Sequence, residues 1–223
     1  MSRHTISYAD QLFHGKAVHH GAYRSQRGVP MTPVVQVDLG VPAATDGDGI
    51  ATDQTPAAGG VQMLTLDGQL NLDVPRNVTI TSTGDDSGRA FTVRGRDQYG
   101  HAMSETIAGA NAGKAEGAKA FAVVESVTVD DDTADAVSVG WATVLGLPFR
   151  IGGAFDVLHA FTDDTEEVGT VVGGDDAPAT ATTGDVRGTI DPGSAPDGSR
   201  HYRVWLKIHD ASSEAGAYGV EQA

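Results

Sequence analysis

Short stretches in which apolar and polar residues alternate recur along the chain and predict β-strands. The clearest is HYRVWLKIHD (201–210), where every second residue from 202 to 208 is apolar and Trp205 falls on the opposite, outer face. VVQVDLGV (34–41) has the same period. Strand candidates follow one another at intervals of about eight to twelve residues, which is typical of a sandwich or barrel. No helical pattern separates them, so the sequence predicts an all-β fold, an antiparallel β-sandwich or barrel.

The middle of the chain carries the strongest hairpin signals. NVTITST (77–83) and RAFTVRGRD (89–97) flank GDDSG (84–88), whose Gly and Asp residues suit a tight turn. QYGH (98–101) predicts a second reversal, into AMSETIAG (102–109). The expected result is a run of neighbouring antiparallel strands.

Other segments are assigned by composition and by breaks in the alternation. A long strand is expected over KAFAVVESVTVD (119–130), with a β-bulge near Glu125 where the alternation shifts. The Gly-, Ala- and Asp-rich segments 42–60 and 108–118 are expected to be loops. AFDVLHAF (154–161) fits either a strand or a helix.

These elements divide the chain into three parts. Residues 1–33 are expected to form an N-terminal extended arm, residues 34–151 the main β-sandwich or barrel, and residues 152–223 a smaller second β region that ends in a flexible tail. The core is modest and no disulfide supports it, because the chain has no cysteine. We therefore expect a homo-oligomer, with a trimer favoured, in which neighbouring copies exchange arms and tails.

The charge of the chain is strongly acidic. The net charge is −15, Asp supplies 23 of the 30 acidic residues, and only four Lys occur. This composition is similar to that of proteins from salt-accumulating halophiles, because molar salt shortens the screening length to about 3 Å and quenches self-repulsion. The alternative is an ordinary acidic protein encoded by a high-GC genome. In either case direct binding to nucleic acid is disfavoured, since that requires a basic face.

The first 33 residues differ in charge from the rest. They hold Arg3, Lys16, Arg24 and Arg27 against Asp10 alone, whereas the remaining 190 residues carry 11 basic and 29 acidic residues. A basic arm on an acidic body suggests docking on an acidic partner. The alternative is that the arm lies along its own body or along a neighbouring subunit.

No targeting or membrane segment is expected from the hydropathy. The chain lacks a run of about 18 apolar residues, so no transmembrane helix is predicted. Its first residues, MSRHTISYADQLFHG, lack the apolar stretch of a secretory signal.

Candidate catalytic motifs are incomplete. The GDDSG segment lacks the GxSxG spacing of a nucleophile elbow, and no His and acid pair completes a triad, so a turn is the better interpretation. No GxxxxGK[ST] motif is present, and the His residues of the arm lack a zinc-binding spacing. We therefore predict no catalytic residues, no enzymatic activity and no cofactor.

Three Asp-rich segments leave cation binding open. They are DGDGIATD (46–53), DDDTAD (130–135) and DDTEE (163–167). The first is similar to a calcium loop, but Ala57 stands where an EF-hand needs its bidentate Glu. Such clusters are usually solvated turns, so the metal assignment stays unknown.

Three phrases in residues 70–151, a little over a third of the chain, carry a resemblance to a known family. LDVPRNVTIT (72–81), FTVRGRDQYGHAMSETI (91–107) and VLGLPFRI (144–151) resemble the capsid decoration (cement) proteins of tailed viruses, including those of haloarchaea. The resemblance implies a virion structural protein that binds the outer head surface and stabilises capsomers against internal DNA pressure. Its location would be the capsid exterior, after assembly in the host cytoplasm.

The resemblance also implies the partners and the surfaces that meet them. The partners would be the major capsid protein and copies of this chain, without direct nucleic acid or membrane contact. The arm residues expected to bind the capsid are Arg3, Tyr8, Leu12, Phe13, Lys16, Tyr23, Arg24 and Arg27. Trp205 and Tyr218 are candidates for the oligomer interface.

Three alternatives remain open. The chain is a tail, fibre or turret component of the virion, a secreted carbohydrate-binding β-domain, or a hydrolase on a β scaffold. A coiled coil or repeat would favour the first, and clustered aromatic residues with a signal peptide the second. The third requires a nucleophile–base pair, which the sequence does not nominate.

Overall fold

The computed structural model describes residues 23–24, 30–31, 34–175 and 177–208, and their regular structure is almost entirely β-strand. The one helical element among them is a single 3₁₀ turn, η1 (Ala154–Asp156). The strands form one large and one small antiparallel sheet, besides the short pair β1 (Tyr23–Arg24) and β2 (Pro30–Met31). The predicted all-β sandwich or barrel is confirmed. No helix in the described residues is long and apolar enough to span a membrane.

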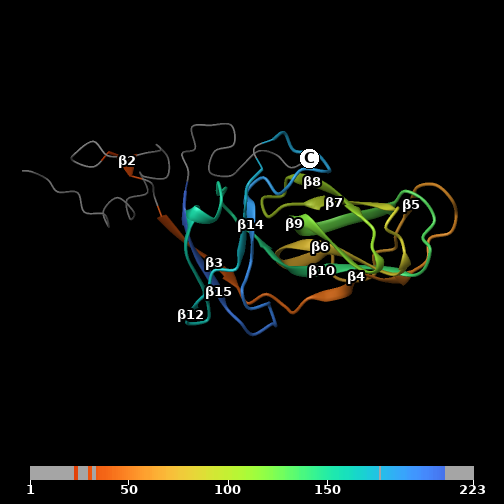
Figure 1. The fold of residues 1–223 in the computed structure, drawn as a ribbon, viewed down its shortest axis with the longest axis horizontal. Helices are drawn as coiled ribbons and strands as arrows, with labels where there is room; N and C mark the ends of the chain where they lie inside the picture. The colour runs from red at the N-terminus through yellow and green to blue at the C-terminus, as the bar shows by residue number, and fades with distance from the viewer. Residues whose placement is uncertain (1–22, 25–29, 32–33, 176, 209–223) are drawn as a thin grey trace, which may run out of the picture.

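The larger sheet curls into a half-barrel, seen on the right of Figure 1. Its strand order is β13-β14-β10-β6-β9-β7-β8, with β4 also paired to β10 and β5 to β9. The bounds are β4 (Asp46–Gln54), β5 (Gln62–Met63), β6 (Asn71–Asp85), β7 (Ala90–Arg96), β8 (Ala102–Ala108), β9 (Asn111–Val129), β10 (Val137–Gly146), β13 (Thr170–Gly173) and β14 (Gly188–Asp191). Its concave side encloses the main apolar core, which includes Ile80, Phe91 and Phe121, all without exposed surface.

The smaller sheet has the order β12-β11-β15-β3 and lies at the other end of the molecule (Figure 1). Its strands are β3 (Val34–Gly40), β11 (Val157–Thr162), β12 (Thr165–Glu166) and β15 (Tyr202–Lys207). The predicted alternation of β15 is confirmed, because Tyr202, Val204, Leu206 and Ile208 are all buried. With residues such as Leu145 and Ile190 of the larger sheet, they form a second apolar core.

The expected pairing of residues 77–83 with residues 89–97 is wrong. The strands β6 and β7 follow each other through the GDDSG turn, but each pairs with β9 instead of with the other. The 19-residue β9 pairs with β6 from Asn111 to Val123 and with β7 from Val123 to Val129. A turn sequence reverses the chain without fixing which strands become neighbours, and here the longer strand β9 takes both partners. The second predicted hairpin, β7 with β8, is confirmed.

Two segments expected to be loops are strands. Residues 46–54 form β4 on the edge of β10, and residues 111–118 form the first half of β9. Their Gly and Ala residues have weak intrinsic β preference, and tertiary pairing overrides it. A Cβ on Gly140 would stand 1.8 Å from the carbonyl oxygen of Asp46, so the small residue is what permits β4 to approach.

The shift in alternation near Glu125 is a true β-bulge. Arg94 of β7 faces Ser126 of β9, while the next residue, Gly95, faces Val124, so Glu125 has no counterpart. A Cβ on Gly95 would lie 1.9 Å from the carbonyl oxygen of Val123, so close backbone approach requires glycine at this point. The bulge expected from the sequence is confirmed.

The ambiguous segment 154–161 combines both of its expected forms, since η1 leads directly into β11.

The first strand of the body, β3, pairs with the last one, β15. Val34 therefore faces Lys207 at one end of the smaller sheet, and residues 1–33 and 209–223 both join the body there.

Candidate interaction surface

The outer face of the smaller sheet gathers aromatic and charged side chains in cross-strand rows. Phe161 faces Glu166 on one side and Arg203 on the other, and Arg203 in turn faces Asp38. In the next row Trp205 lies between His159 and Gln36. We call the outward residues of these two rows, together with Lys207, the outer face. They are Gln36, Asp38, His159, Phe161, Glu166, Arg203, Trp205 and Lys207.

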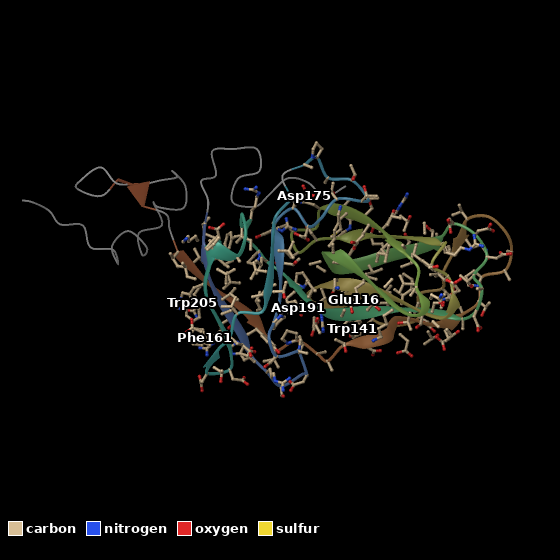
Figure 2. All side chains as sticks on the ribbon, in the orientation of Figure 1. Glu116, Trp141, Phe161, Asp175, Asp191 and Trp205 are labelled. Carbon is tan, nitrogen blue, oxygen red and sulfur yellow. The ribbon has the colours of Figure 1, made fainter. Side chains whose placement is uncertain are left out.

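Three rings form the centre of the outer face. The centroids of Phe161 and Trp205 are 5.2 Å apart with the planes at 66°, and those of His159 and Trp205 are 6.3 Å apart at 89°. Figure 2 shows Phe161 and Trp205 next to each other at the end of the molecule away from the half-barrel. Edge-to-face contacts of this kind contribute about 0.5–1.5 kcal/mol each beyond area burial. The rings therefore hold each other in place while Trp205 keeps part of its surface open.

Polar contacts surround the rings. His159 Nδ1 lies 2.5 Å from Glu166 Oε1, and the Arg203 guanidinium donates to the carbonyl of Asp163 at 2.5 Å. Lys207 Nζ donates to the carbonyl of Phe155 at 2.8 Å. Phe155 itself is 91% exposed.

Charges of both signs surround the rings on a strongly acidic body. The outer face holds two cations, Arg203 and Lys207, and two carboxylates, Asp38 and Glu166, and the exposed carboxylate of Asp164 lies 3.6 Å from Arg203. Residues 34–208 as a whole hold 11 basic and 26 acidic residues. Asp38 is firmly ionised, because hydrogen bonds from the backbone N–H of Gly40 and from His201 lower its pKa. The outer face thus combines an apolar centre with a border that carries charges of both signs.

The sequence predicted only part of this site. Trp205 was expected on the outer face and lies there, half-buried by its ring neighbours. His159 and Phe161 were not grouped with it, because a register shift at Leu158 breaks the two-residue period of β11. The part of β11 after Leu158 is too short for its alternation alone to predict which residues point outward.

Most of the predicted capsid-binding arm lies outside the described residues. This applies to Arg3, Tyr8, Leu12, Phe13, Lys16 and Arg27, and also to Tyr218 of the candidate oligomer interface. Tyr23 and Arg24 form β1, but only their backbone pairing is described. These residues stay predictions.

A second feature is a buried ionic cluster between the two cores. Arg187 donates to Asp97 at 2.7 Å, with 3% and 0% of the two side chains exposed, and it also lies over the ring of Tyr99. Asp185 accepts hydrogen bonds from the backbone N–H groups of Ala120 and of Arg187. These contacts bind the segment before β14 to the end of the half-barrel.

The same cluster includes a buried carboxylate and a buried ammonium. Glu105 accepts from the backbone N–H of Ala118, and Lys119 donates to the carbonyl of Thr180 at 2.6 Å. Burial raises the pKa of Glu105 and lowers that of Lys119. Each charged head is held by backbone groups, which is the arrangement of a structural cluster.

The Asp-rich segments use their carboxylates to cap turns. Asp131 and Asp132 accept the backbone N–H groups of Gly60 and Gly59. In the GDDSG turn, the buried Asp86 accepts from the N–H of Ala134 at 2.6 Å. Within the described part of the chain, no group of three or more His, Asp or Glu side chains is placed to hold a metal ion.

Comparison with known protein families, characterised proteins and solved structures found no match to this chain. The function must therefore be argued from its own residues.

Proposed function

We propose that this protein is a virion structural protein that decorates the head of a tailed virus. The proposal rests on the resemblance of three sequence phrases to decoration proteins. In the fold these phrases form parts of β6, the β7–β8 hairpin and the end of β10, so the resemblance concerns the frame of the half-barrel. The observation that supports a binding role is the aromatic outer face, at the end where residues 1–33 join the body.

The division of charge suggests how the chain would bind a capsid. The basic arm would lie on an acidic capsid surface, while the acidic body would face solvent. In molar salt the screening length is about 3 Å, so Coulomb attraction acts only at contact. Tyr8, Leu12, Phe13 and Tyr23 would then supply much of the affinity of the arm.

Several arms acting together would turn weak contacts into firm attachment. Once one arm is bound, the next binds at the effective concentration set by the tether, which in favourable geometry raises avidity by about 10²–10⁴. An oligomer that bridges adjacent capsomers would resist their separation under internal pressure. The mechanism requires no catalytic group.

The test is co-sedimentation with purified heads of the parent virus in high salt. The full-length protein should pellet saturably, at a copy number commensurate with capsomer symmetry. A variant with Arg3, Lys16, Arg24 and Arg27 changed to Gln should pellet less, and one with Tyr8, Leu12 and Phe13 changed to Ser should pellet least. Full-length protein that stays in the supernatant with intact heads would overturn the proposal and direct attention to the tail.

A further inference from the structure

We infer that the free edge of β8 accepts an additional β-strand from an extended, acidic segment of a partner protein. This goes beyond the proposed function, since it requires no capsid. It rests on the direction of the backbone groups of β8, on the one backbone contact that this edge already makes, and on the positive charge beside it.

The register of β7 and β8 shows which backbone groups point to the edge. β8 is the last strand of the larger sheet, at the upper border of the half-barrel in Figure 1. Just outside the two strands, Asp97 donates to the carbonyl of His101 and Gly109 donates to that of Arg89. In an antiparallel pair, such hydrogen-bonded positions alternate with positions whose groups point away from the partner. The residues of β8 that point away from β7 are therefore Ala102, Ser104, Thr106 and Ala108.

This edge already binds backbone at one point. The N–H group of Thr106 donates to the carbonyl of Ala181, in the loop between β13 and β14, at 2.6 Å. The outward N–H groups of Ala102 and Ser104 make no hydrogen bond to any described residue. β8 also has no proline, lysine or bulge, which are features that often keep an edge strand from pairing. The edge is therefore open to an extended chain beside residues 102–105.

A cation without a carboxylate partner lies next to this open part. On the convex side of the half-barrel, Arg94 stands between Ser104 of β8 and Ser126 of β9, so both of its neighbours are small. Its side chain is exposed and makes no hydrogen bond or ion pair within the described residues, although 26 of residues 34–208 are acidic. Since a long side chain can lie along its neighbours, Arg94 would extend across Ser104 to a carboxylate on the added strand.

The other charged groups near this edge are already engaged. Arg96 pairs with Glu125 at 2.6 Å. Asp97 is bound to a buried arginine, and Glu105 is itself buried and turned to the inside of the half-barrel. Asp175 accepts two backbone N–H groups of its own loop. Molar salt screens the remaining acidic charge of the body beyond about 3 Å, so the contact with Arg94 would favour an acidic strand over a basic one.

The expected binding is weak and reversible. Strand addition takes its affinity from main-chain hydrogen bonds and its selectivity from alternate side chains. Ala102 and Ser104 each offer one outward N–H and one outward C=O group, so a short extended segment can pair with both. One carboxylate opposite Ser104 would then meet Arg94.

The experiment is fluorescence anisotropy of a labelled peptide of alternating Val and Glu, titrated with the full chain in high salt. We expect saturable binding. Ser104→Pro removes an outward N–H without breaking a bond to β7, a place where edge strands tolerate proline, and should abolish binding. Arg94→Gln should raise the dissociation constant about two- to five-fold, as for an exposed ion pair. Arg200→Gln makes the same charge change in the turn before β15 and should leave the constant unchanged.

Amide hydrogen exchange gives a readout that needs no variant and stays valid if Ser104→Pro lowers stability. Exchange at Ala102 and Ser104 should slow when the peptide binds the parent protein. The absence of saturable binding, unchanged exchange at both residues, or equal binding by a folded Ser104→Pro variant would overturn the inference. So would a peptide with Lys in place of Glu that binds as tightly. Capsid binding by the arm is tested separately by co-sedimentation, so the two proposals can fail independently.

Discussion

The buried pair Asp97–Arg187 makes the sharpest prediction about what holds the two cores together. Asp97 follows β7 in the half-barrel and Arg187 precedes β14, so the pair joins segments that are 90 residues apart. The Asp97 carboxylate also accepts the backbone N–H groups of Tyr99 and His101. Replacing Asp97 with Ala removes all three acceptor contacts and leaves the guanidinium buried without its carboxylate.

The expected cost of Asp97→Ala is large. Removing one partner of a buried ion pair destabilises a protein by about 3–5 kcal/mol, because the remaining charge loses its compensation. Arg187 has only 3% of its side chain exposed, so water cannot replace the lost partner. The double variant Asp97→Ala, Arg187→Met removes both charges and should recover part of the loss, since burying an apolar side chain costs less than burying a cation that has lost its carboxylate.

The chain provides a matched control in Asp197. This carboxylate also accepts backbone N–H groups of its own turn, from Ser199 and Arg200, and lies 3.2 Å from the guanidinium of Arg200. Both partners of that pair are about 40% exposed, so Asp197→Ala should be far milder.

The assay is urea unfolding in high salt, followed by circular dichroism and by Trp emission. Asp97→Ala should lower the midpoint strongly, and Asp197→Ala only slightly. Equal effects of the two substitutions would refute the claim that burial gives the Asp97–Arg187 pair its importance. A double variant less stable than Asp97→Ala would refute the claim that the loss comes from burying the guanidinium without the Asp97 carboxylate.

Three further predictions follow from the strands, the turns and the charge. Gly95→Ala should lower the melting temperature strongly because its Cβ would clash with the Val123 carbonyl, whereas Gly88→Ala, with open space around it, should not. Hydrogen bonds from the side chain and backbone of Ser199 lower the pKa of Asp197 to about 2, measurable by NMR titration. Since the unfolded value is about 3.9, its stabilisation is complete above that pH and lost as pH falls towards 2, and Asp197→Asn should remove that loss. Reducing salt from molar to about 0.1 M should lower the melting temperature, and an unchanged value would contradict the halophile interpretation.

The sequence revealed elements whose signals are local. The alternation of β15 and the bulge at Glu125 each follow from the order of apolar and polar residues within one short segment. Both are confirmed. Partner choice is not local: nothing between residues 77 and 97 shows that β9 will take both β6 and β7 as neighbours. Likewise β4 is a strand only because Gly140 lets its backbone approach, a fact visible from neither segment alone.

The same difference between local and non-local signals applies to the candidate site. Trp205 stands out by its place in a regular strand, whereas His159 and Phe161 are hidden by the irregular register of β11. The buried cluster of Asp97 and Arg187 gave no signal at all, because its members come from segments with unrelated patterns. Charged residues in turns are normally solvated, and only the fold shows that these two are not.

The pairing of β3 with β15 determines when the outer face can form during folding. These are the first and last strands of the body. The contact between His201 and Asp38 joins residues 163 positions apart. Contacts so distant in sequence form late, because the closure of a long loop must be compensated by structure already in place. The Trp205 surface and the end where residues 1–33 join the body are therefore completed together, after the chain is synthesised to β15.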